Sequence, residues 1–578
     1  MWDELRAEFA DGLRQAALAA ADAGELPPLP EPFVTFAVER PREEAHGDLA
    51  ANLAMLLARP LGRPPRAIAE AIARRYPYPL GHVASLEVAG AGFLNARLDH
   101  LWPAVALARV LAAGEAYGRR PPTASLPSVL LEFVSANPTG PLNLVNARAA
   151  AVGDALANVL EAAGHRVHRE FYMNDAGNQA RLFGQTILAR VRELVTGQPE
   201  PLPVDGYQGL YVVDVARAFL DAVPEAAAAP AMGPAADAMA DRAGIFGMEM
   251  MVRNQRATLE RYRVRFDEFV SERALRQGDA VERALRALDE RGYLYEEDGA
   301  LWFRSTAEDL AGLDDKPRVL RKSDGELAYF AVDIAYHESK YERGHDTLVD
   351  LIGPDHHGYL GRMRAAMRAL GHPPDSLEMR VVQLVRLVQG GEVVRMSKRR
   401  GDFVAMDDLL DEVGTSAARF FLVNRHLDSP FDFDLDLARV QGDENPVFYV
   451  QYAHARISSI LRRPEAQAAL SAVPAPDLSL LAEPEEIALI RWLAEFPGEV
   501  RLAADLREPH RIPRYAMELA GRFHSFYNRH RVLGVEPALS AARLRLIEAV
   551  ATSVRNALGL IGVEAPERME RLTADPQA

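Results

Sequence analysis

The segment Arg395 to Gly401, RMSKRRG, places four cations within six residues, directly after an apolar run and a Gly390–Gly391 turn. Such a loop can neutralise a polyphosphate. A solvated basic loop is the usual alternative for a charge run without context. Here the context favours a ligand site, because a loop after a late strand of a doubly wound sheet lies at the carboxyl edge, where ligands bind.

A second candidate site lies between Val129 and Asn146, which read VLLEFVSANPTGPLNLVN. The pattern predicts a strand, a tight Pro/Gly turn and a helix from Ala147 onward. Unpaired N–H groups and the positive end of the helix dipole would hold phosphates near Asn143 to Ala147. Taken alone, Asn143 is as readily explained as a simple N-cap.

A third candidate is the pair Tyr329 and Asp333, which lie four residues apart and share one face of a predicted helix. A carboxylate can hold a guanidinium through two hydrogen bonds while an aromatic ring stacks on its plane. The commoner outcome of this spacing is a core tyrosine beside a surface aspartate.

A fourth candidate, Asp355, His356 and His357, follows a predicted strand from Thr347 to Ile352. Two histidines beside an aspartate are also compatible with a metal site. The chain has no cysteine and these histidines lack helical spacing, so we favour hydrogen bonds to a bound nucleotide or substrate. We therefore expect no zinc and no metal held by the protein alone.

The composition sets the broad class. At 578 residues the chain is too long for one core and predicts about two to four domains. The absence of cysteine excludes disulfides, thiolate zinc sites and a cysteine nucleophile. The net charge of −16 argues against a surface that attracts polyanions everywhere, although local basic faces can hold RNA. No segment predicts a signal peptide or a membrane span, so we expect a cytoplasmic protein.

The elements that must position these residues fall into three parts, and the predicted fold class is multidomain α/β. Residues 1–115 predict a small α+β domain. Residues 121–433 alternate strand and helix and predict a doubly wound parallel-sheet domain, with an insertion around 191–245. Residues 434–578 carry long amphipathic segments and predict an all-α helical bundle.

Within these parts, apolar periodicity predicts a helix from Asp48 to Leu57 and a strand from Val381 to Val388. The segment Val223 to Ala236, VPEAAAAPAMGPAA, has little to pack and predicts a mobile interruption.

Six segments lie in a fixed order along the chain: SANPTGPL from Ser135, FYMNDAGNQ from Phe171, YFAVDIAYH from Tyr329, GPDHHGY from Gly353, RMSKRRGD from Arg395 and NPVFYVQYAHARISSI from Asn445. Together they resemble the bacterial arginyl-tRNA synthetases, which are class I enzymes, over nearly the whole chain. The resemblance implies a Rossmann-like catalytic domain between an N-terminal tRNA-binding domain and a C-terminal anticodon-binding domain. It also implies a monomer that uses ATP with Mg²⁺ to form an arginyl-adenylate and transfers L-arginine to the 3′ end of arginine tRNA.

The same resemblance implies roles for individual residues. Arginine binding falls on Glu132, Ser135, Asn137, Glu272, Tyr329, Asp333 and His357. ATP binding falls on Gly140, Asn143, Asn146, Asp355, His356, Met396, Ser397 and Lys398. Catalysis falls on Lys398, Arg395, Asn143 and Asn146, with Lys398 stabilising the leaving pyrophosphate.

The chain departs from the family pattern at Asn143 to Asn146, NLVN, where relatives usually carry His-x-Gly-His. Asparagine keeps a short hydrogen-bond donor but cannot become positively charged. Val145 places a β-branched side chain where glycine would let the backbone approach the nucleotide.

Three hypotheses follow. The first is a working synthetase that positions ATP differently, and the second is a non-catalytic or weakly active relative that binds arginine or tRNA. We favour the first because the other residues of the site remain. The third, an unrelated nucleotidyl-transfer enzyme, leaves the helical C-terminal region unexplained.

Arginines and aromatic residues alternate between Arg507 and Arg531. Arginines can hold RNA phosphates while exposed rings stack on loop bases. Equally, the aromatic residues could form a bundle core and the arginines could be solvated. We predict tRNA contacts at Arg522 and Arg529, and the resemblance adds Tyr452 and Arg456.

Overall fold

The computed structural model describes residues 2–41, 43, 46–78, 80–228, 233–394 and 404–569, and of residues 81 and 355–357 it describes the backbone only. The basic loop with Arg395, Met396, Ser397 and Lys398 lies outside the described residues, as do the side chains of Asp355, His356 and His357.

The N-terminal part combines three helices with an antiparallel sheet of order β1-β2-β4-β3. Its elements are α1 (Trp2–Asp22), β1 (Val38–Glu39), β2 (Leu49–Ala51), α2 (Leu53–Leu61), α3 (Pro65–Arg74), η2 (Leu80–His82), β3 (Val83–Ala89) and β4 (Phe93–Leu98). The predicted helix from Asp48 to Leu57 is wrong in its first half. Leu49–Ala51 instead pairs with β4, and this sheet pairing overrides the local helical pattern.

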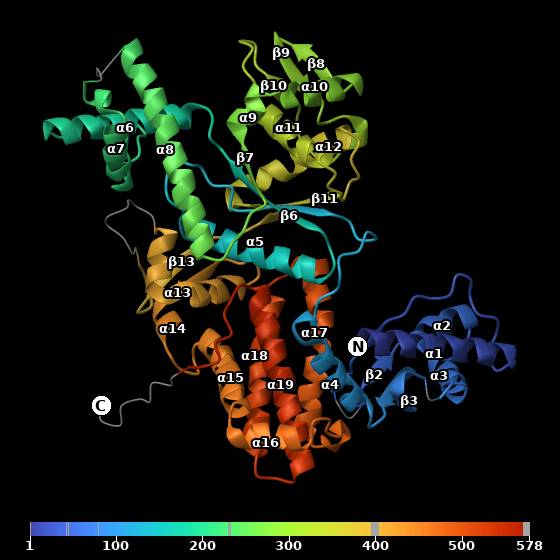
Figure 1. The fold of residues 1–578 in the computed structure, drawn as a ribbon. Helices are drawn as coiled ribbons and strands as arrows, with labels where there is room; N and C mark the ends of the chain where they lie inside the picture. The colour runs from blue at the N-terminus through green and yellow to red at the C-terminus, as the bar shows by residue number, and fades with distance from the viewer. Residues whose placement is uncertain are drawn as a thin grey trace.

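A five-stranded, wholly parallel sheet of order β12-β11-β5-β6-β7 forms the centre of the molecule. Its strands are β5 (Val129–Glu132), β6 (Val167–Met173), β7 (Glu268–Ser271), β11 (Thr347–Ile352) and β12 (Leu377–Val381). Figure 1 shows α5 (Leu144–Ala162) on one side of the sheet and α11 (Tyr329–Glu342) on the other. Helices on both faces confirm the predicted doubly wound arrangement.

Smaller elements surround this sheet. They are α9 (Glu272–Gln277), α10 (Ala280–Glu290), β8 (Leu294–Glu297), β9 (Ala300–Phe303), η5 (Glu308–Leu310), β10 (Arg318–Arg321), η6 (Pro354–Tyr359), α12 (Leu360–Ala369), β13 (Val385–Gln389), β14 (Glu392–Val393), α13 (Met406–Val423), β15 (Phe431–Asp434) and α14 (Leu435–Arg439). The single strand predicted from Val381 to Val388 is wrong: β12 ends at Val381, and β13 pairs with β14 and β15 in another sheet.

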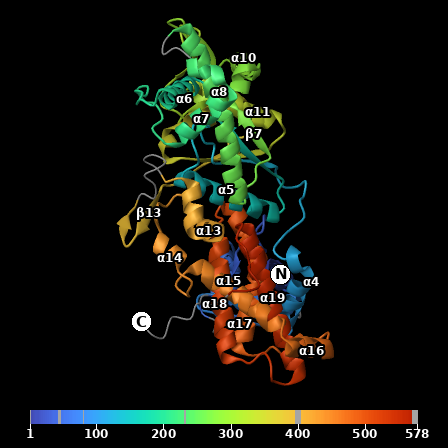
Figure 2. The ribbon, with the colours of Figure 1, turned by 60° about the vertical axis from the view of Figure 1, so that its left-hand side comes forward.

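Three helices, α6 (Asn178–Thr196), α7 (Tyr211–Ala222) and α8 (Pro234–Arg261), pack around an apolar cluster of their own. They project from the sheet, as Figure 2 shows in a second orientation. The predicted interruption at Val223–Ala236 contains η4 (Pro224–Ala228), and its residues 229–232 lie outside the described part of the chain.

Beyond β15 the described residues form helices and loops, as the sequence predicts. The C-terminal helices are α15 (Pro446–Leu461), α16 (Pro464–Ala472), η7 (Leu478–Leu480), α17 (Pro484–Leu506), α18 (Arg511–Arg529) and α19 (Pro537–Leu560). The connecting helices α4 (Trp102–Ala113) and η3 (Gly114–Ala116) pack against this bundle. None of the helices in the described part of the chain is long and apolar enough to cross a membrane.

The buried Arg419 of α13 joins the catalytic sheet to the bundle. Its guanidinium donates to the Ile561 carbonyl at 2.7 Å and to the Tyr262 carbonyl at 2.8 Å. It also forms an ion pair of 2.5 Å with Asp154 of α5, whose side chain is buried too. Because every one of these partners is enclosed, the end of the chain and the helix that carries Asn143 are held in one fixed relation.

Candidate active site

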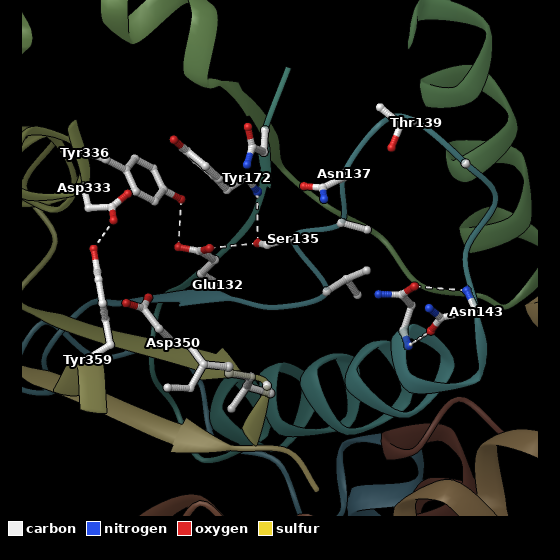
Figure 3. Close-up of a pocket in the computed structure, with 18 of the residues that line it drawn as sticks. Glu132, Ser135, Asn137, Thr139, Asn143, Tyr172, Asp333, Tyr336, Asp350 and Tyr359 are labelled. Carbon is white, nitrogen blue, oxygen red and sulfur yellow. Dashed lines mark hydrogen bonds between the residues drawn. The ribbon is translucent and has the colours of Figure 1, made fainter. Parts of the chain in front are cut away.

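A cavity of about 680 Å³ opens at the carboxyl ends of β5, β6 and β11, between α11 and the N-terminus of α5. Figure 3 shows its lining side chains. Eight of the predicted site residues line it: Glu132, Ser135, Asn137, Gly140, Asn143, Asn146, Tyr329 and Asp333. The cavity therefore brings together the predicted arginine residues and the predicted phosphate end of α5.

The loop after β5 enters the cavity in a strained conformation. Val134 and Ser135 have φ values of 70° and 41°, in the left-handed region that a β-branched residue rarely adopts. The Ser135 hydroxyl donates to Glu132 Oε1 at 2.8 Å and accepts from the Tyr172 backbone N–H at 3.1 Å. These bonds hold the Glu132 carboxylate in a fixed position (Figure 3).

The buried ammonium of Lys340 supports the acidic wall of the cavity. Lys340 Nζ donates to Glu132 Oε2 at 2.6 Å and to Asp350 Oδ1 at 2.8 Å, and His337 Nε2 lies 2.8 Å from Asp350 Oδ2. Burial disfavours the charged form of Lys340, but the Asp350 and Glu132 carboxylates outweigh it and raise its pKa. Burial likewise disfavours the Asp350 carboxylate, yet Lys340 and His337 lower its pKa. Both groups are thus charged at neutral pH.

Tyr336 links this wall to the next strand. Its hydroxyl lies 2.8 Å from Glu132 Oε2 and 2.7 Å from Glu170 Oε1, so it can donate to either carboxylate. Glu170 in turn accepts from Arg343 at 2.6 Å. Glu132 therefore faces the cavity with one oxygen already bonded to both Lys340 and Tyr336.

Asp333 differs from the other acids of the cavity. It is 7% exposed, accepts a hydrogen bond from the Tyr359 hydroxyl, and has no ion pair with a described cationic side chain. Burial is the main cause that raises its pKa to about 7, and the negative charges of Glu272 and Glu132 add to it. An added cation would find in Asp333 a carboxylate whose charge is not yet compensated.

The first turn of α5 is closed by its own side chains. Asn143 Oδ1 accepts from the backbone N–H groups of Val145 (2.9 Å) and Asn146 (3.1 Å), and Asn146 Oδ1 accepts from the Asn143 N–H at 3.0 Å. The N–H groups of Leu144 and Ala147 donate to the carbonyls of Val404 and Asn143. The backbone N–H groups from Asn143 to Ala147 therefore already have hydrogen-bond acceptors within the protein. The prediction that they are unpaired is wrong.

What this end still offers to a ligand is the helix dipole and two neutral amide groups. Asn143 and Asn146 line the cavity, and neither Nδ2 donates to a described residue. Val145 is half-buried and is absent from the cavity lining. Its side chain therefore does not fill the space that the cavity provides.

The segment that follows the basic loop returns to this helix end. Met406 N–H donates to the Leu142 carbonyl at 2.8 Å, and Asn143 forms a bridge with Ala405. The buried Arg148 of α5 donates to the carbonyls of Gln383 (2.7 Å) and Ser429 (2.9 Å), which flank β13 and β15. The segment after the basic loop is thus bonded to the N-terminus of α5, and Arg148 ties α5 to the residues before β13 and β15.

The three-helix insertion contacts the loop that carries Asn137. Gln255 Nε2 of α8 donates to the carbonyls of Asn137 (3.0 Å) and Gly140 (2.8 Å), and the Tyr211 hydroxyl of α7 donates to the Thr139 carbonyl at 2.7 Å. Gln255 is only 2% exposed. The insertion therefore fixes the loop backbone directly.

Glu272 lies beside the cavity but is absent from its lining. It is 1% exposed, its Oε1 accepts from Arg276 at 2.7 Å, and its Oε2 has no hydrogen-bond partner among the described residues. It raises the pKa of the nearby Asp333 and Tyr329, after burial. Glu272 thus adds negative charge behind the acidic side of the cavity.

Sequence reasoning missed several residues of the cavity. They are Tyr172, Tyr336, His337, Asp350 and Tyr359, together with the supporting Lys340, Tyr211 and Gln255. Two of them, His337 and Lys340, carried a detectable signal, because with the predicted Asp333 they recur at i, i+4 and i+7 on one helix face. The others depend on contacts between distant strands, which spacing does not reveal.

The described residues contain one cluster with the ligands for a metal ion, His168, Glu170 and Glu268. Arg343 Nη1 lies 2.6 Å from Glu170 and 2.5 Å from Glu268. An arginine already occupies the position that a cation would take, so the cluster is better explained as an ion pair.

Of the residues predicted to contact tRNA, Tyr452 and Arg456 lie on α15 and Arg522 and Arg529 on α18. Arg522 pairs with Glu518 at 2.8 Å and stacks on Trp492, whereas Arg529 pairs with Glu485 and is the most exposed of them at 67%. Of Arg522 and Arg529, Arg529 is therefore the better placed to contact an RNA phosphate.

The aromatic residues of α18 divide into two groups. Tyr515, Phe523 and Phe526 are 0–2% exposed and belong to the bundle core, so the core alternative holds for them. Tyr527 is half-buried, and the Arg456 guanidinium lies 4.4 Å from its ring centroid. Only Tyr527 and Tyr452 remain as stacking candidates from the predicted face.

Comparison with known proteins assigns the class. Residues 107–428, which include the parallel sheet and the cavity, match the family model "tRNA synthetases class I (R), catalytic domain". The chain thus carries the catalytic domain of a class I aminoacyl-tRNA synthetase. Residues 3–98 match "Arginyl tRNA synthetase N terminal domain", and residues 450–569 match "DALR anticodon binding domain".

Whole-chain relatives narrow the assignment. The chain is 47% identical to an arginine–tRNA ligase of Symbiobacterium thermophilum, over 98% of each protein. It is also 47% identical to an arginine–tRNA ligase of Desulforudis audaxviator, over 98% of this chain and 99% of the relative. The Thermus thermophilus arginyl-tRNA synthetase superposes with a TM-score of 0.73 at 25% identity, covering 96% of this chain and 99% of that structure. The chain belongs to the arginyl-tRNA synthetase family.

Proposed function

We propose that this member of the family joins L-arginine to the 3′ end of arginine tRNA in two steps. In the first, the arginine carboxylate attacks the α-phosphorus of ATP, forming arginyl-adenylate and releasing pyrophosphate. In the second, a ribose hydroxyl of the terminal adenosine attacks the arginyl carbonyl, and AMP leaves. ATP and arginine tRNA are substrates, and Mg²⁺ enters bound to the ATP phosphates.

The observation that carries the proposal is that one cavity has two chemically different ends, an acidic end and an end formed by the N-terminus of α5. The acidic end suits a guanidinium, because Asp333 has no ion pair with a cation among the described residues and Glu132 is held rigidly by Ser135 and Lys340. Tyr329, half-exposed at the mouth, can stack on the same group. Glu272 would add a further carboxylate.

At the other end, the α5 dipole and the amide groups of Asn143 and Asn146 face the space for ATP. Asn137 would bind the amino acid, and Gly140 would let the nucleotide approach the loop backbone. Lys398 and Arg395 would stabilise the leaving pyrophosphate, with Met396, Ser397, Asp355 and His356 beside the nucleotide and His357 beside arginine. The anchoring of residues 404–406 to α5 supports a basic loop that returns to this end.

Arginine- and tRNA-dependent exchange of pyrophosphate into ATP tests the first step, and charging of arginine tRNA tests the second. We expect both activities in the purified protein. Exchange at background with tRNA binding intact would instead favour the non-catalytic alternative. In that case the triple change Asn143→His, Val145→Gly and Asn146→His should raise the exchange rate.

The RNA face has a separate test. Arg529→Glu should weaken tRNA binding and lower the slope of log K against log salt by about one, because one phosphate contact is lost. Arg529→Gln removes the charge without reversing it and should have a smaller effect. The same affinity and slope in all three proteins would remove Arg529 from the interface, leaving Arg522, Tyr452 and Arg456 to be tested in the same way. We also expect a cytoplasmic monomer. Sedimentation of the purified protein tests the oligomeric state.

A further inference from the structure

Tyr172, at the end of β6, presents a buried hydroxyl to the cavity with nothing to bond. The residue is 7% exposed and lines the cavity, and its Oη has no hydrogen-bond partner among the described residues. Figure 3 shows its side chain on the same side of the cavity as Tyr336 and Asp333. Buried polar atoms are nearly always paired, so an unpaired one inside a ligand cavity requires an explanation.

The position of this hydroxyl is fixed by the rest of the residue. The Tyr172 backbone N–H donates to Ser135 Oγ at 3.1 Å, and its strand pairs on both sides, with β5 and β7. Its ring packs against Tyr336 with centroids 4.5 Å apart. The phenol therefore has little freedom to turn toward another partner, and it is held in place before any ligand binds.

The surroundings of the hydroxyl are acidic. Burial has the largest effect in raising the pKa of Tyr172, and the negative charges of Glu272 and Asp333 raise it further. Tyr172 is therefore a neutral phenol near carboxylates. Glu272 Oε2, which is also buried, lacks a hydrogen-bond partner among the described residues as well. Tyr172 Oη and Glu272 Oε2 are therefore two buried polar atoms without a hydrogen-bond partner among the described residues, and Tyr172 lines the cavity in which a ligand can reach it.

The chemistry of the two atoms defines that ligand. A carboxylate oxygen can only accept hydrogen bonds, and a phenol can donate one and accept others. A group that satisfies both must supply several N–H donors and positive charge. The guanidinium has five N–H donors in one plane, so it meets the requirement better than an ammonium or a neutral side chain.

We propose that Tyr172 is a substrate-binding residue that determines specificity, whose phenolic oxygen accepts an N–H of the arginine guanidinium beside Glu272. This rests on the proposed function, which supplies arginine as the substrate. Tyr172 thereby extends the guanidinium site from Asp333 and Glu132 to the adjacent strand β6.

The competing explanation is that the Tyr172 ring fills space and the hydroxyl has no role. Tyr262 provides a matched control, because it is also a buried tyrosine with an Oη that lacks a hydrogen-bond partner among the described residues. Tyr262 packs beside Arg419 and does not line the cavity. Tyr172→Phe removes a hydroxyl inside the cavity, and Tyr262→Phe makes the same chemical change outside it.

The experiment compares Tyr172→Phe with Tyr262→Phe in the full-length protein. Arginine affinity is measured by calorimetry without ATP, and KM and kcat by pyrophosphate exchange with tRNA present. Tyr172→Phe should weaken arginine binding and raise the KM for arginine about ten- to a hundredfold, the usual range for a hydrogen bond to a charged group. The KM for ATP and kcat should change less than about twofold, because ground-state binding alone is lost. Tyr262→Phe should leave all of these values unchanged.

A second ligand tests whether the guanidinium is the group that is bound. L-norleucine retains the amino and carboxylate groups of arginine but lacks the guanidinium. Its inhibition constant should be the same in the wild type and in Tyr172→Phe. If both ligands weaken equally, or if arginine binding stays within twofold of the wild type, the assignment is overturned.

Glu272→Gln supplies a variant that does not depend on the fold of Tyr172→Phe. It should also weaken arginine more than norleucine, and the double change should cost less than the sum of the two single changes. Additive effects would show that the two groups do not share a ligand. If the wild type binds arginine but lacks exchange activity, the catalytic proposal fails while the calorimetric test of Tyr172 still stands.

Discussion

At one end of the cavity, Glu132 and Asp350 share the buried ammonium of Lys340, while Asp333 keeps an uncompensated carboxyl group. At the other end, Asn143 and Asn146 cap one turn of helix with neutral amides. The acidic end depends on side chains brought together from β5, α11 and β11. The asparagine end is built from four consecutive residues.

This difference predicts where the site tolerates substitution. A buried charge left without its partner is costly, so single changes at the acidic end affect both folding and binding. A helix cap can be replaced by any short side chain with an acceptor, so the asparagine end can change its residues and keep its backbone. The departure from His-x-Gly-His that the resemblance predicts therefore falls at the end of the cavity that tolerates substitution better.

The largest effect should come from Lys340→Met. It removes the cation from the buried Asp350 and the half-buried Glu132, and we expect the free energy of unfolding to fall by about 3–5 kcal/mol, with arginine binding lost. Urea unfolding and calorimetry measure the two effects. Lys322→Met, which breaks an exposed pair with Glu326, is the control and should change neither quantity. If Lys340→Met lowers the free energy of unfolding by less than about 1 kcal/mol, the acidic end is no more sensitive to substitution than the asparagine end.

The next effect is the pH dependence of arginine binding. Because burial raises the pKa of Asp333 to about 7, the carboxyl group is mostly neutral below pH 7 and cannot pair with a guanidinium. The KM for arginine should therefore rise about tenfold for each pH unit below 7. Stability shifts the other way: the arginine-free protein should lose stability as pH rises through 7, since the folded state favours the protonated form.

Asp333→Asn tests both statements. It should raise the KM for arginine throughout and remove the dependence on pH between 5.5 and 8. A wild-type KM that stays constant over this range would show that Asp333 is ionised in the free protein. The KM for ATP, which depends on the other end of the cavity, serves as the internal control.

The smallest effect separates capping from substrate binding at Asn143. Asn143→Ala should lower the free energy of unfolding by about 1 kcal/mol, because the cap is lost. Asn143→Ser keeps an acceptor for the cap but lacks the amide donor. It should keep the stability while raising the KM for ATP about three- to tenfold, as for one neutral hydrogen bond. An unchanged KM for ATP in Asn143→Ser would mean that the amide does not contact the nucleotide.

The sequence predicted the elements whose signals are local. The strand at Thr347–Ile352 and the long C-terminal helices follow from apolar periodicity, and the strand, turn and helix around Asn143 follow from apolar and turn residues. The predictions for Asp48–Ala51 and Val381–Val388 were wrong because pairing with distant strands, and not the local sequence pattern, sets the structure there. The ends of these strands are set by the strands with which they pair.

The site divides in the same way. Tyr329 and Asp333 were found because both lie on one turn of α11. Lys340 was missed as a partner of Glu132, since 208 positions separate the two residues in the chain. The occupied N–H groups of α5 were missed because capping by Asn146 requires the side-chain geometry.

Arg419 has a consequence for how the protein is made. During synthesis the chain emerges from its N-terminus, and domains generally fold as they appear. The guanidinium of Arg419 has its acceptors at Tyr262 and Asp154 early, but the Ile561 carbonyl is added only after the C-terminal helices have been translated. A ribosome that stops shortly before residue 561 would release a catalytic domain whose central arginine lacks one acceptor. The hydrogen bonds of Arg419 are therefore complete only when the segment after α19 is in place.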